Sequence, residues 1–378
     1  MADTAAHLVD HVIPSVPVRQ WVLSLPYSLR FRAAFDSILM GEVLRIFVRA
    51  VFAWLRKQAQ ENGIPYGKCG SVTFVQRFGS ALNLTPHFHT VVLDGVYVCA
   101  VEGEPPRFYA GRPPDAKEVA AVANRVAMRV AALLEKRDGA SEPEEPAMAD
   151  LYGASITGRL ATGPNAGQKV KTLGEFQDES LEGRGSRCAM VSGFSVHAGV
   201  SLHAKDRKGL ERLLSYAARP PIAMDRLEQL PDGRLTYRLK TPWRNGTTHV
   251  TFEPLEFLSR LAVLVPAPRV NTIRFHGLLG PAAEWRAAIV PIPPEIETDD
   301  CGHESDRNEK EGRRRNYAWA SLMARVFEID VLKCTECNGR LRILAAIHPP
   351  VNTRKILESM GLPSRAPPVA PLVSDSTF

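Results

Sequence analysis

Three groups of residues in this chain have the chemistry of a reactive or metal-binding site. His87 and His89 flank a single phenylalanine, Tyr216 lies in the basic segment RKGLERLLSYAARPPI, and Cys334 and Cys337 form a CxxC pair. Two imidazoles on one face of a strand can share a divalent metal ion. A tyrosine can act as a nucleophile, and two thiols can supply half of a zinc site.

The histidine pair lies within residues 70–99, GSVTFVQRFGSALNLTPHFHTVVLDGVYVC. Side chains alternate along a strand, so His87 and His89 point to one face and Phe88 to the other. The pattern predicts antiparallel strands over 71–78 and 87–93, and an Asp94-Gly95 hairpin turn leading to a third strand over 96–98. The alternative is a pair of partly buried histidines packed on a sheet.

The basic segment around Tyr216 is predicted to be a helix. Asp206 is a suitable N-cap, Leu210, Leu213 and Leu214 recur at helical spacing, and Pro220 ends the segment. A tyrosine on such a helix can attack a phosphodiester if it faces a metal ion bound to the same phosphate. The alternative is a tyrosine that closes the helix with its hydroxyl group in solvent.

Composition limits the class of protein. The 378 residues carry a net charge of +6 with a pI near 9.0, which favours an anionic partner such as nucleic acid. The sequence has no run of eighteen apolar residues and no secretory signal at its start, so we expect no membrane association. Six cysteines with one CxxC pair suit a reducing cytoplasm.

The remaining elements predict an α+β fold, an antiparallel sheet with flanking helices. We expect a first strand over 21–26, an edge strand within 271–277, and a hairpin around Asn245-Gly246. Helices are expected over 27–62, with arginines and a lysine interleaved, and over 115–136 and 254–264.

The predicted organisation has five parts. An N-terminal tail covers 1–16, and one domain covers 17–294, with 101–187 as an excursion or insertion within it. A charged linker covers 295–316. A C-terminal appendage with a helix and the CxxC segment covers 317–348, and a proline-rich, disordered tail covers 349–378.

The combination of motifs resembles a known family. TFVQRFGSALNLTPHFHTVVLDGVY followed by ERLLSYAARPPIA resembles the HUH-nuclease transposases of bacterial rolling-circle insertion sequences, of the insertion sequence ninety-one and common-region type. The resemblance extends from about Val16 to Leu344, and it includes VPVRQWVLSLP, SGFSVHAGV and WASLMARVFEIDVLKCTECNGRLRILAAI. The HUH motif alone is unspecific, whereas its combination with the flanking motifs is specific.

The resemblance implies an HUH-endonuclease-like fold that nicks and joins single-stranded DNA in transposition. His87 and His89 would bind Mg²⁺ or Mn²⁺, with Gln76 as third ligand and Asn83 and Asp94 as alternatives. Tyr216 would form a 5′-phosphotyrosine and release a 3′-hydroxyl. The basic residues expected to bind the DNA are Arg77, Arg207, Lys208, Arg212 and Arg219. The protein would act in the bacterial cytoplasm, at the nucleoid.

The chain departs from the family pattern at two places. Members with two catalytic tyrosines have the other one four positions earlier, where this chain has Arg212. One tyrosine would then act sequentially, or two subunits of an oligomer would each supply one. The zinc-binding domain that usually precedes VPVRQW is also missing, and this suggests an N-terminally truncated or alternatively started copy.

Three questions of interpretation stay open. Cys334 and Cys337 are either a zinc half-site or reduced structural thiols, since Cys301, His303 and His348 lack matching spacing. The chain could be an inactive DNA-binding remnant of the family. An unrelated metal hydrolase is the third alternative, for which further Asp, Glu or His ligands are expected.

Overall fold

A computed structural model describes residues 1–99, 104–137, 146–173, 187–243, 245–266, 269–291, 319–342 and 350–361. The chain divides into two compact units, Met1–Glu311 and Gly312–Phe378. The first unit contains both the histidine pair and Tyr216, and the second contains the CxxC pair. We describe each unit by itself.

A six-stranded antiparallel sheet forms the centre of the first unit. Its strand order is β12-β2-β3-β1-β8-β7. The strands are β1 (Val18–Ser24), β2 (Gly70–Phe78), β3 (Leu84–Leu93), β7 (Cys188–Val191), β8 (Phe194–Leu202) and β12 (Ile273–Gly277). The histidine strand β3 is therefore central, between β2 and β1. The predicted α+β class, the pairing of β2 with β3 and the edge position of β12 are confirmed.

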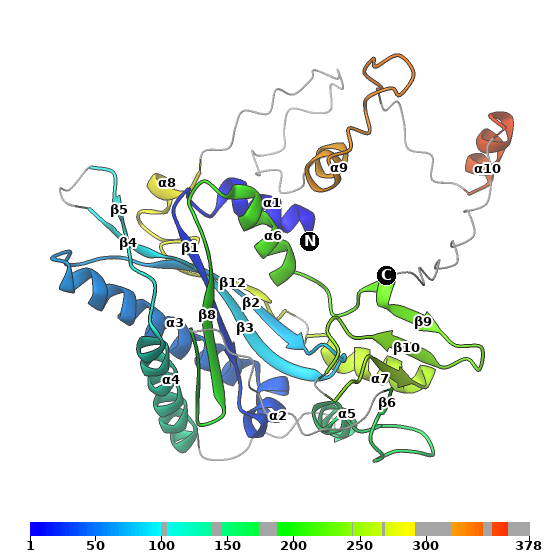
Figure 1. Cartoon of the computed structure of the whole chain (residues 1–378), viewed down its shortest axis with the longest axis horizontal. Helices are drawn as coiled ribbons and strands as arrows, with labels where there is room; N and C mark the ends of the chain where they lie inside the picture. Colours follow the sequence, from blue (N-terminus) through cyan, green and yellow to red (C-terminus); the bar gives the residue numbers. More distant parts are fainter. Residues whose placement is uncertain are drawn as a thin grey trace. The chain divides into compact units, whose positions relative to one another are not determined.

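Helices cover both faces of this sheet (Figure 1). On one face α1 (Ala2–His11) and α6 (Arg207–Ala217) share a hydrophobic core with Phe74 and Val91. On the other face α2 (Tyr27–Phe35), α3 (Ser37–Glu61) and α4 (Ala116–Lys136) share a core with Trp21 and Phe88. Because strand side chains alternate, His87 and His89 lie on the α1/α6 face, together with Val91.

A smaller sheet packs against the turn between β2 and β3. Its order is β6 (Lys171–Leu173), β11 (His249–Phe252), β10 (Leu235–Arg238) and β9 (Leu227–Gln229), where β9 follows the short helix η1 (Met224–Arg226). Tyr237 and Phe252 of this sheet share a core with Phe78 and Leu84. Two helices, α5 (Pro146–Thr157) and α7 (Pro254–Leu264), complete this region. The predicted pairing of β10 with β11 and the predicted helix α7 are confirmed.

The Asp94-Gly95 hairpin prediction is wrong. Residues 95–98 form β4 (Gly95–Val98), which pairs with β5 (Arg107–Ala110) in a separate two-stranded sheet, and not with β3. The Asp94 carboxylate is buried and accepts hydrogen bonds of 3.1 and 2.8 Å from the Arg19 guanidinium of β1. That long-range ion pair fixes Asp94 at the end of β3, and β1 takes the neighbouring place in the sheet.

Several other boundaries differ from the predictions. The helix expected over 27–62 is two helices, because Asp36 adopts an extended conformation and its carboxylate accepts a 2.7 Å hydrogen bond from the Leu39 amide. Residues expected as an N-terminal tail form α1, which buries Ala5, Leu8 and Val9. The excursion 101–187 contributes Ile156 and Val170 to the core of the smaller sheet. A four-residue helix, α8 (Arg286–Ile289), follows β12.

The second unit contains α9 (Trp319–Phe327), the loop with Cys334 and Cys337, and α10 (Pro350–Ser359). The predicted helix before the CxxC pair is confirmed. Residues 350–359, expected within a disordered tail, are helical instead, and the charged linker 295–316 lies outside the described residues. None of the described helices is both long and apolar enough to cross a membrane.

Candidate active site

The two histidine rings lie side by side on the α1/α6 face, with their centroids 5.0 Å apart. The His87 Nδ1 atom is 2.7 Å from the Thr85 carbonyl oxygen. A carbonyl oxygen can only accept, so Nδ1 carries the hydrogen and the lone pair is on Nε2. A backbone carbonyl that fixes the tautomer in this way is common for metal-binding histidines.

His89 is buried, and its Nδ1 atom lies 3.1 Å from the side-chain amide of Gln20 on β1. The amide nitrogen of Gln20 faces the ring and donates to Nδ1, which puts the hydrogen of the neutral imidazole on its own Nε2. Turning the Gln20 amide over would place its oxygen there, so that Nδ1–H donates and His89 Nε2 becomes a ligand. Burial first, and then the charges of His87 and Arg219, together lower the pKa of His89 to about 3. Burial also lowers the pKa of His87. Both imidazoles are therefore neutral near pH 7, the form that binds metals.

Gln76 of β2 lies directly opposite His87 in the β2–β3 ladder, so the two side chains share one face. Its Nε2 atom donates a 2.7 Å hydrogen bond to the Ala217 carbonyl oxygen at the end of α6. This bond fixes the orientation of the amide, because a carbonyl cannot donate. The Oε1 atom is then left buried with no hydrogen-bond partner. A buried acceptor without a partner is costly, and a bound cation would satisfy it.

The two alternative third ligands have other partners. Asn83 donates a 2.7 Å hydrogen bond to Thr85 Oγ1 in the turn before β3. Asp94 lies at the far end of β3 in the ion pair with Arg19. Among the described residues, no three His, Cys, Asp or Glu side chains are grouped so that they could hold a metal ion. The histidine pair with the Gln76 oxygen is therefore the donor set that these residues fit best.

Tyr216 reaches this site from α6. The helix begins where the Asp206 carboxylate accepts a 2.7 Å hydrogen bond from the Gly209 amide, which confirms the predicted cap. Leu210 and Leu214 are buried against the sheet and α1. The Tyr216 side chain is 39% exposed, and its ring is edge-on to the His89 ring with the centroids 6.2 Å apart. The structure thus brings Tyr216 and the histidine pair together.

Two cations contact the Tyr216 ring. The Arg219 guanidinium lies 4.4 Å from the ring centroid, and the Lys240 ammonium, which follows β10 of the smaller sheet, lies 4.7 Å from it. Sequence reasoning identified Arg219 but missed Lys240 and Gln20. Neither has a local signal, because Lys240 follows a short hairpin strand and Gln20 reaches His89 only through the β1–β3 pairing.

The five arginines and lysines predicted to bind DNA fall into two groups. Arg77 donates to the Ala34 and Val263 carbonyl oxygens at 2.7 and 3.0 Å, and burial lowers its pKa. Arg207 donates to the carbonyl oxygens of Val9, in the last turn of α1, and of Ile13 and Pro14, just after α1. These two guanidinium groups connect elements of the fold, and their role in DNA binding stays a prediction. Lys208, Arg212, Tyr216 and Arg219 follow one side of α6, at helical spacings of four, four and three residues.

The CxxC loop of the second unit has a defined shape. Lys333 and Arg340 form an antiparallel bridge, and the Cys334 amide donates a 2.8 Å hydrogen bond to the Gly339 carbonyl oxygen. The Gly339 amide points at the Cys337 sulfur at 3.4 Å. Backbone amides of Cys337 and Glu336 lower the pKa of the Cys334 thiol. The three residues considered as further zinc ligands, Cys301, His303 and His348, lie outside the described residues.

Comparison with protein families shows the family to which the chain belongs. A model of the family described as "Putative transposase" matches residues 70–286, which is more than half of the chain. The chain belongs to this transposase family, so its partner is DNA. The matched range includes β2, β3 and α6, and hence the histidine pair and Tyr216. Comparison with curated proteins gives no match, and comparison with solved structures gives none.

Proposed function

We propose that this transposase cuts and rejoins single-stranded DNA through Tyr216, by the HUH mechanism of rolling-circle insertion sequences. The observation that carries the proposal is the edge-on contact of the Tyr216 and His89 rings, 6.2 Å between centroids, which joins two motifs far apart in the sequence. A nucleophile and a metal-type donor set at this separation can contact one phosphodiester.

The proposed reaction exchanges one phosphate ester bond for another. The Tyr216 phenol oxygen attacks the phosphorus and loses its proton, and the bond from phosphorus to the 3′-oxygen breaks. The products are a 5′-phosphotyrosine and a 3′-hydroxyl, which takes up a proton. Attack by a 3′-hydroxyl on the phosphotyrosine reverses these steps and joins the strands. No oxidant, reductant or cosubstrate is needed.

The protein's side chains have separate tasks in this reaction. His87, His89 and the Gln76 oxygen would hold Mg²⁺ or Mn²⁺, which when bound polarises the scissile phosphate. Thr85 and Gln20 orient the two imidazoles. Arg219 and Lys240 place positive charge beside the Tyr216 ring, where the attacked phosphate must lie. Lys208 and Arg212 extend this charge along α6 and suit the strand that leads to the site.

The test is a search for a covalent protein–DNA adduct. The full chain is incubated with circular single-stranded DNA of mixed sequence and Mg²⁺, and the adduct is isolated in detergent, trimmed with nuclease and located by mass spectrometry. We expect a nucleotide on Tyr216 and none in Tyr216→Phe. The control Tyr66→Phe, which changes an exposed tyrosine in a turn, should react like the wild type.

Two outcomes would contradict the proposal. An adduct on another tyrosine would make that residue the nucleophile. DNA binding without any adduct would support the inactive remnant. The unrelated metal hydrolase is disfavoured by the donor set, because no third His, Cys, Asp or Glu side chain joins the histidine pair among the described residues.

For the second unit we propose that Cys334 and Cys337 bind zinc as half of a four-ligand site. The support is the loop shape, in which backbone amides surround both sulfur atoms. Purified full-length protein should contain zinc, and the double variant Cys334→Ser/Cys337→Ser should lose it, whereas Cys188→Ser should retain it. Zinc-free wild-type protein would instead identify the two cysteines as structural thiols.

A further inference from the structure

The face of the first unit opposite the candidate active site carries two rows of basic residues. On α3, Arg45, Arg49 and Arg56 are exposed and follow one another at intervals of four and seven residues. On α4, Arg125, Arg129 and Lys136 are exposed and repeat the same intervals. Intervals of four and seven place residues on one side of a helix. Each helix therefore presents one basic row to solvent.

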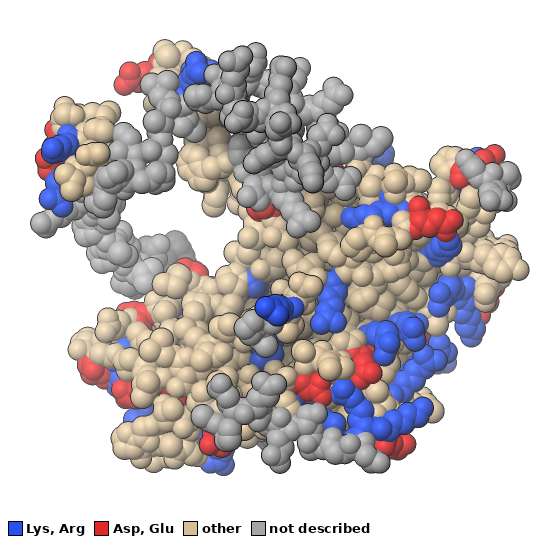
Figure 2. Space-filling model, turned by 180° about the vertical axis from the view of Figure 1, so that it is seen from behind, with Lys and Arg blue, Asp and Glu red and all other residues tan. Residues whose placement is uncertain are grey.

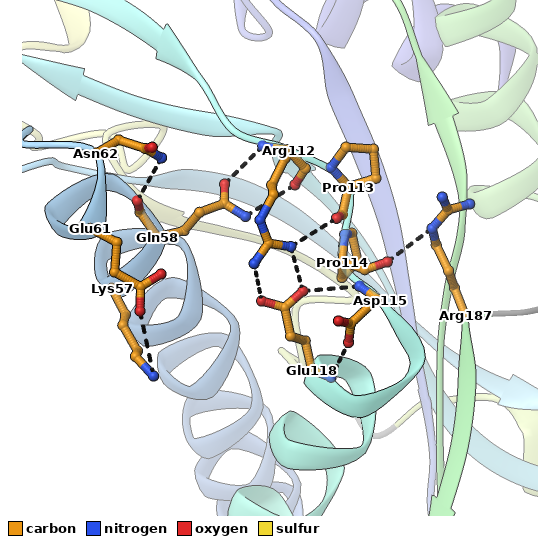
Figure 3. A network of polar contacts seen from close by, with 10 residues as sticks. All are labelled: Lys57, Gln58, Glu61, Asn62, Arg112, Pro113, Pro114, Asp115, Glu118 and Arg187. Carbon is orange, nitrogen blue, oxygen red and sulfur yellow. Dashed lines mark hydrogen bonds and ion pairs between the residues drawn. The ribbon is translucent and has the colours of Figure 1, made fainter.

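The two helices hold these rows next to each other. At one end the Gln58 amide of α3 donates to the Arg112 carbonyl oxygen, and the Arg112 guanidinium pairs with Glu118 of α4 (Figure 3). At the other end Arg137, just after α4, pairs with Asp36, just before α3, at 2.8 Å. The helices are thus antiparallel neighbours. A groove between them is lined by alanines and Trp54, by the basic Lys57 and Arg125, and by the acidic Glu61 and Glu118.

The rows carry more positive charge than their surroundings neutralise. Together α3 and α4 contain eight basic and four acidic residues, a net charge of +4 in a chain whose total is +6. Figure 2 is turned by 180° from Figure 1, and it shows Lys and Arg gathered at the lower right, the side to which this turn brings α3 and α4. Arg45 pairs with Glu42 and Lys57 with Glu61, each at 3.6 Å. On α3 and α4, all of whose residues are described, four arginines make no ion pair or hydrogen bond: Arg49, Arg56, Arg125 and Arg129.

We propose that this surface binds the phosphates of duplex DNA while the strand to be cut lies at Tyr216. We name it the rear basic face, and it consists of Arg49, Arg56, Lys117, Arg125, Arg129 and Lys136; Arg45 and Lys57 are paired with acidic residues and do not belong to it. Unpaired arginines in rows on two neighbouring helices suit a polymer with regularly spaced phosphates. The choice of DNA rests on the transposase family and on the proposed function.

The arrangement keeps this DNA separate from the strand at the active site. The sheet and its apolar core, including Phe47 and Phe88, lie between the rear basic face and the α1/α6 face. One short strand cannot contact both surfaces. The protein would therefore bind two DNA segments at once, as a reaction that moves one DNA into another requires.

A matched pair of variants tests the proposal. Arg49→Gln/Arg56→Gln removes two unpaired charges from α3, and Arg45→Gln/Lys57→Gln removes two ion-paired charges from the same helix. Duplex affinity is measured by fluorescence anisotropy between about 0.05 and 0.2 M salt. The slope of log K against log salt is negative, and each lost phosphate contact reduces its magnitude by about 0.9. The slope of the first variant should therefore be smaller in magnitude by about 1.8. At about 0.1 M salt we expect it to bind at least tenfold more weakly, and the second variant to stay within about threefold of wild type.

Adding Arg125→Gln/Arg129→Gln to the first variant should roughly double its loss of slope. In the same proteins, adduct formation on a short single strand should equal that of the wild type. Equal weakening in the two paired variants, or stronger binding to anionic vesicles than to duplex, would overturn the inference. Because duplex binding and adduct formation are separate readouts, an inactive wild type that still shows the expected slopes would refute the proposed function and leave the rear basic face standing.

Discussion

Alternate residues of strands β1, β2 and β3 point to opposite faces of the sheet, and the two faces have different chemistry. On the α3/α4 face, two pairs of buried polar side chains bond to each other, Thr73 to Thr90 at 3.0 Å and Arg19 to Asp94, while the buried Ser71 hydroxyl has no partner. On the α1/α6 face, Gln76 keeps an unsatisfied buried oxygen opposite His87. The first arrangement stabilises the fold, and the second leaves a position that a ligand can complete. The proposed catalytic chemistry therefore lies on one side of these strands.

The largest expected effect is on the α1/α6 face. His87→Ala removes one nitrogen donor, so metal-dependent adduct formation should fall by roughly a hundredfold or more. The unfolding free energy should fall by only about 1 kcal/mol, because the half-buried ring makes one hydrogen bond. Adduct assays and urea unfolding measure both quantities. The control His203→Ala changes an exposed histidine before α6, and cleavage that survived His87→Ala unchanged would remove the metal role.

The adjacent residue should behave in the opposite way. Phe88 lies between the two histidines but points into the α3/α4 core, where its side chain is fully buried. Phe88→Ala should lower the unfolding free energy by about 3–5 kcal/mol, measured by urea unfolding. The fraction that stays folded should still form the adduct. Phe88→Leu should cost less, and a loss below about 1 kcal/mol in Phe88→Ala would contradict the assignment of faces.

These opposite expectations show what the sequence predicts well. Local alternation was enough to place His87 and His89 on one face and Phe88 on the other. The cap at Asp206 and the hairpin around Asn245-Gly246 were predictable for the same reason, since each depends on residues within a few positions.

Features that depend on distant partners were not predictable from local patterns. Asp94-Gly95 has the sequence of a hairpin turn, but Arg19 holds Asp94 in the sheet, and this partner is far away in the chain. Gln20 and Lys240 reach the site only through strand pairing and through the smaller sheet. Arg77 is basic and close to the histidine strand, yet it binds backbone carbonyls of two helical elements. Charge alone does not show such a role.

A third prediction uses the buried state of His89. Its pKa is about 3 in the folded chain against an ordinary value of 6.5. Between these values the unfolded chain binds a proton that the folded chain does not, so stability falls as the pH decreases below 6.5. At pH 5 this loss is about 2 kcal/mol. His89→Gln should remove this part of the difference between unfolding free energies at pH 7 and pH 5. His203→Gln should keep it, and an unchanged difference in His89→Gln would show that His89 is protonated in the folded state.

The smallest expected change in stability is at Gln76. This residue separates two roles of the α1/α6 face, the packing of α6 on the sheet and the binding of a metal. Gln76→Met removes the unsatisfied oxygen but also the hydrogen bond to the Ala217 carbonyl oxygen, so the unfolding free energy should change by less than about 1 kcal/mol. Adduct formation should nevertheless fall by roughly tenfold to a hundredfold.

Gln76→Glu should show the reverse pattern. A carboxylate keeps an oxygen donor for the metal, so adduct formation should be retained at saturating Mg²⁺. The same carboxylate cannot donate to the Ala217 carbonyl oxygen and places two acceptors against each other, so urea unfolding should detect a lower stability. If the Met variant cuts DNA like the wild type, the third donor is not Gln76, and the unsatisfied oxygen belongs to the packing of α6 on the sheet instead of to the metal site.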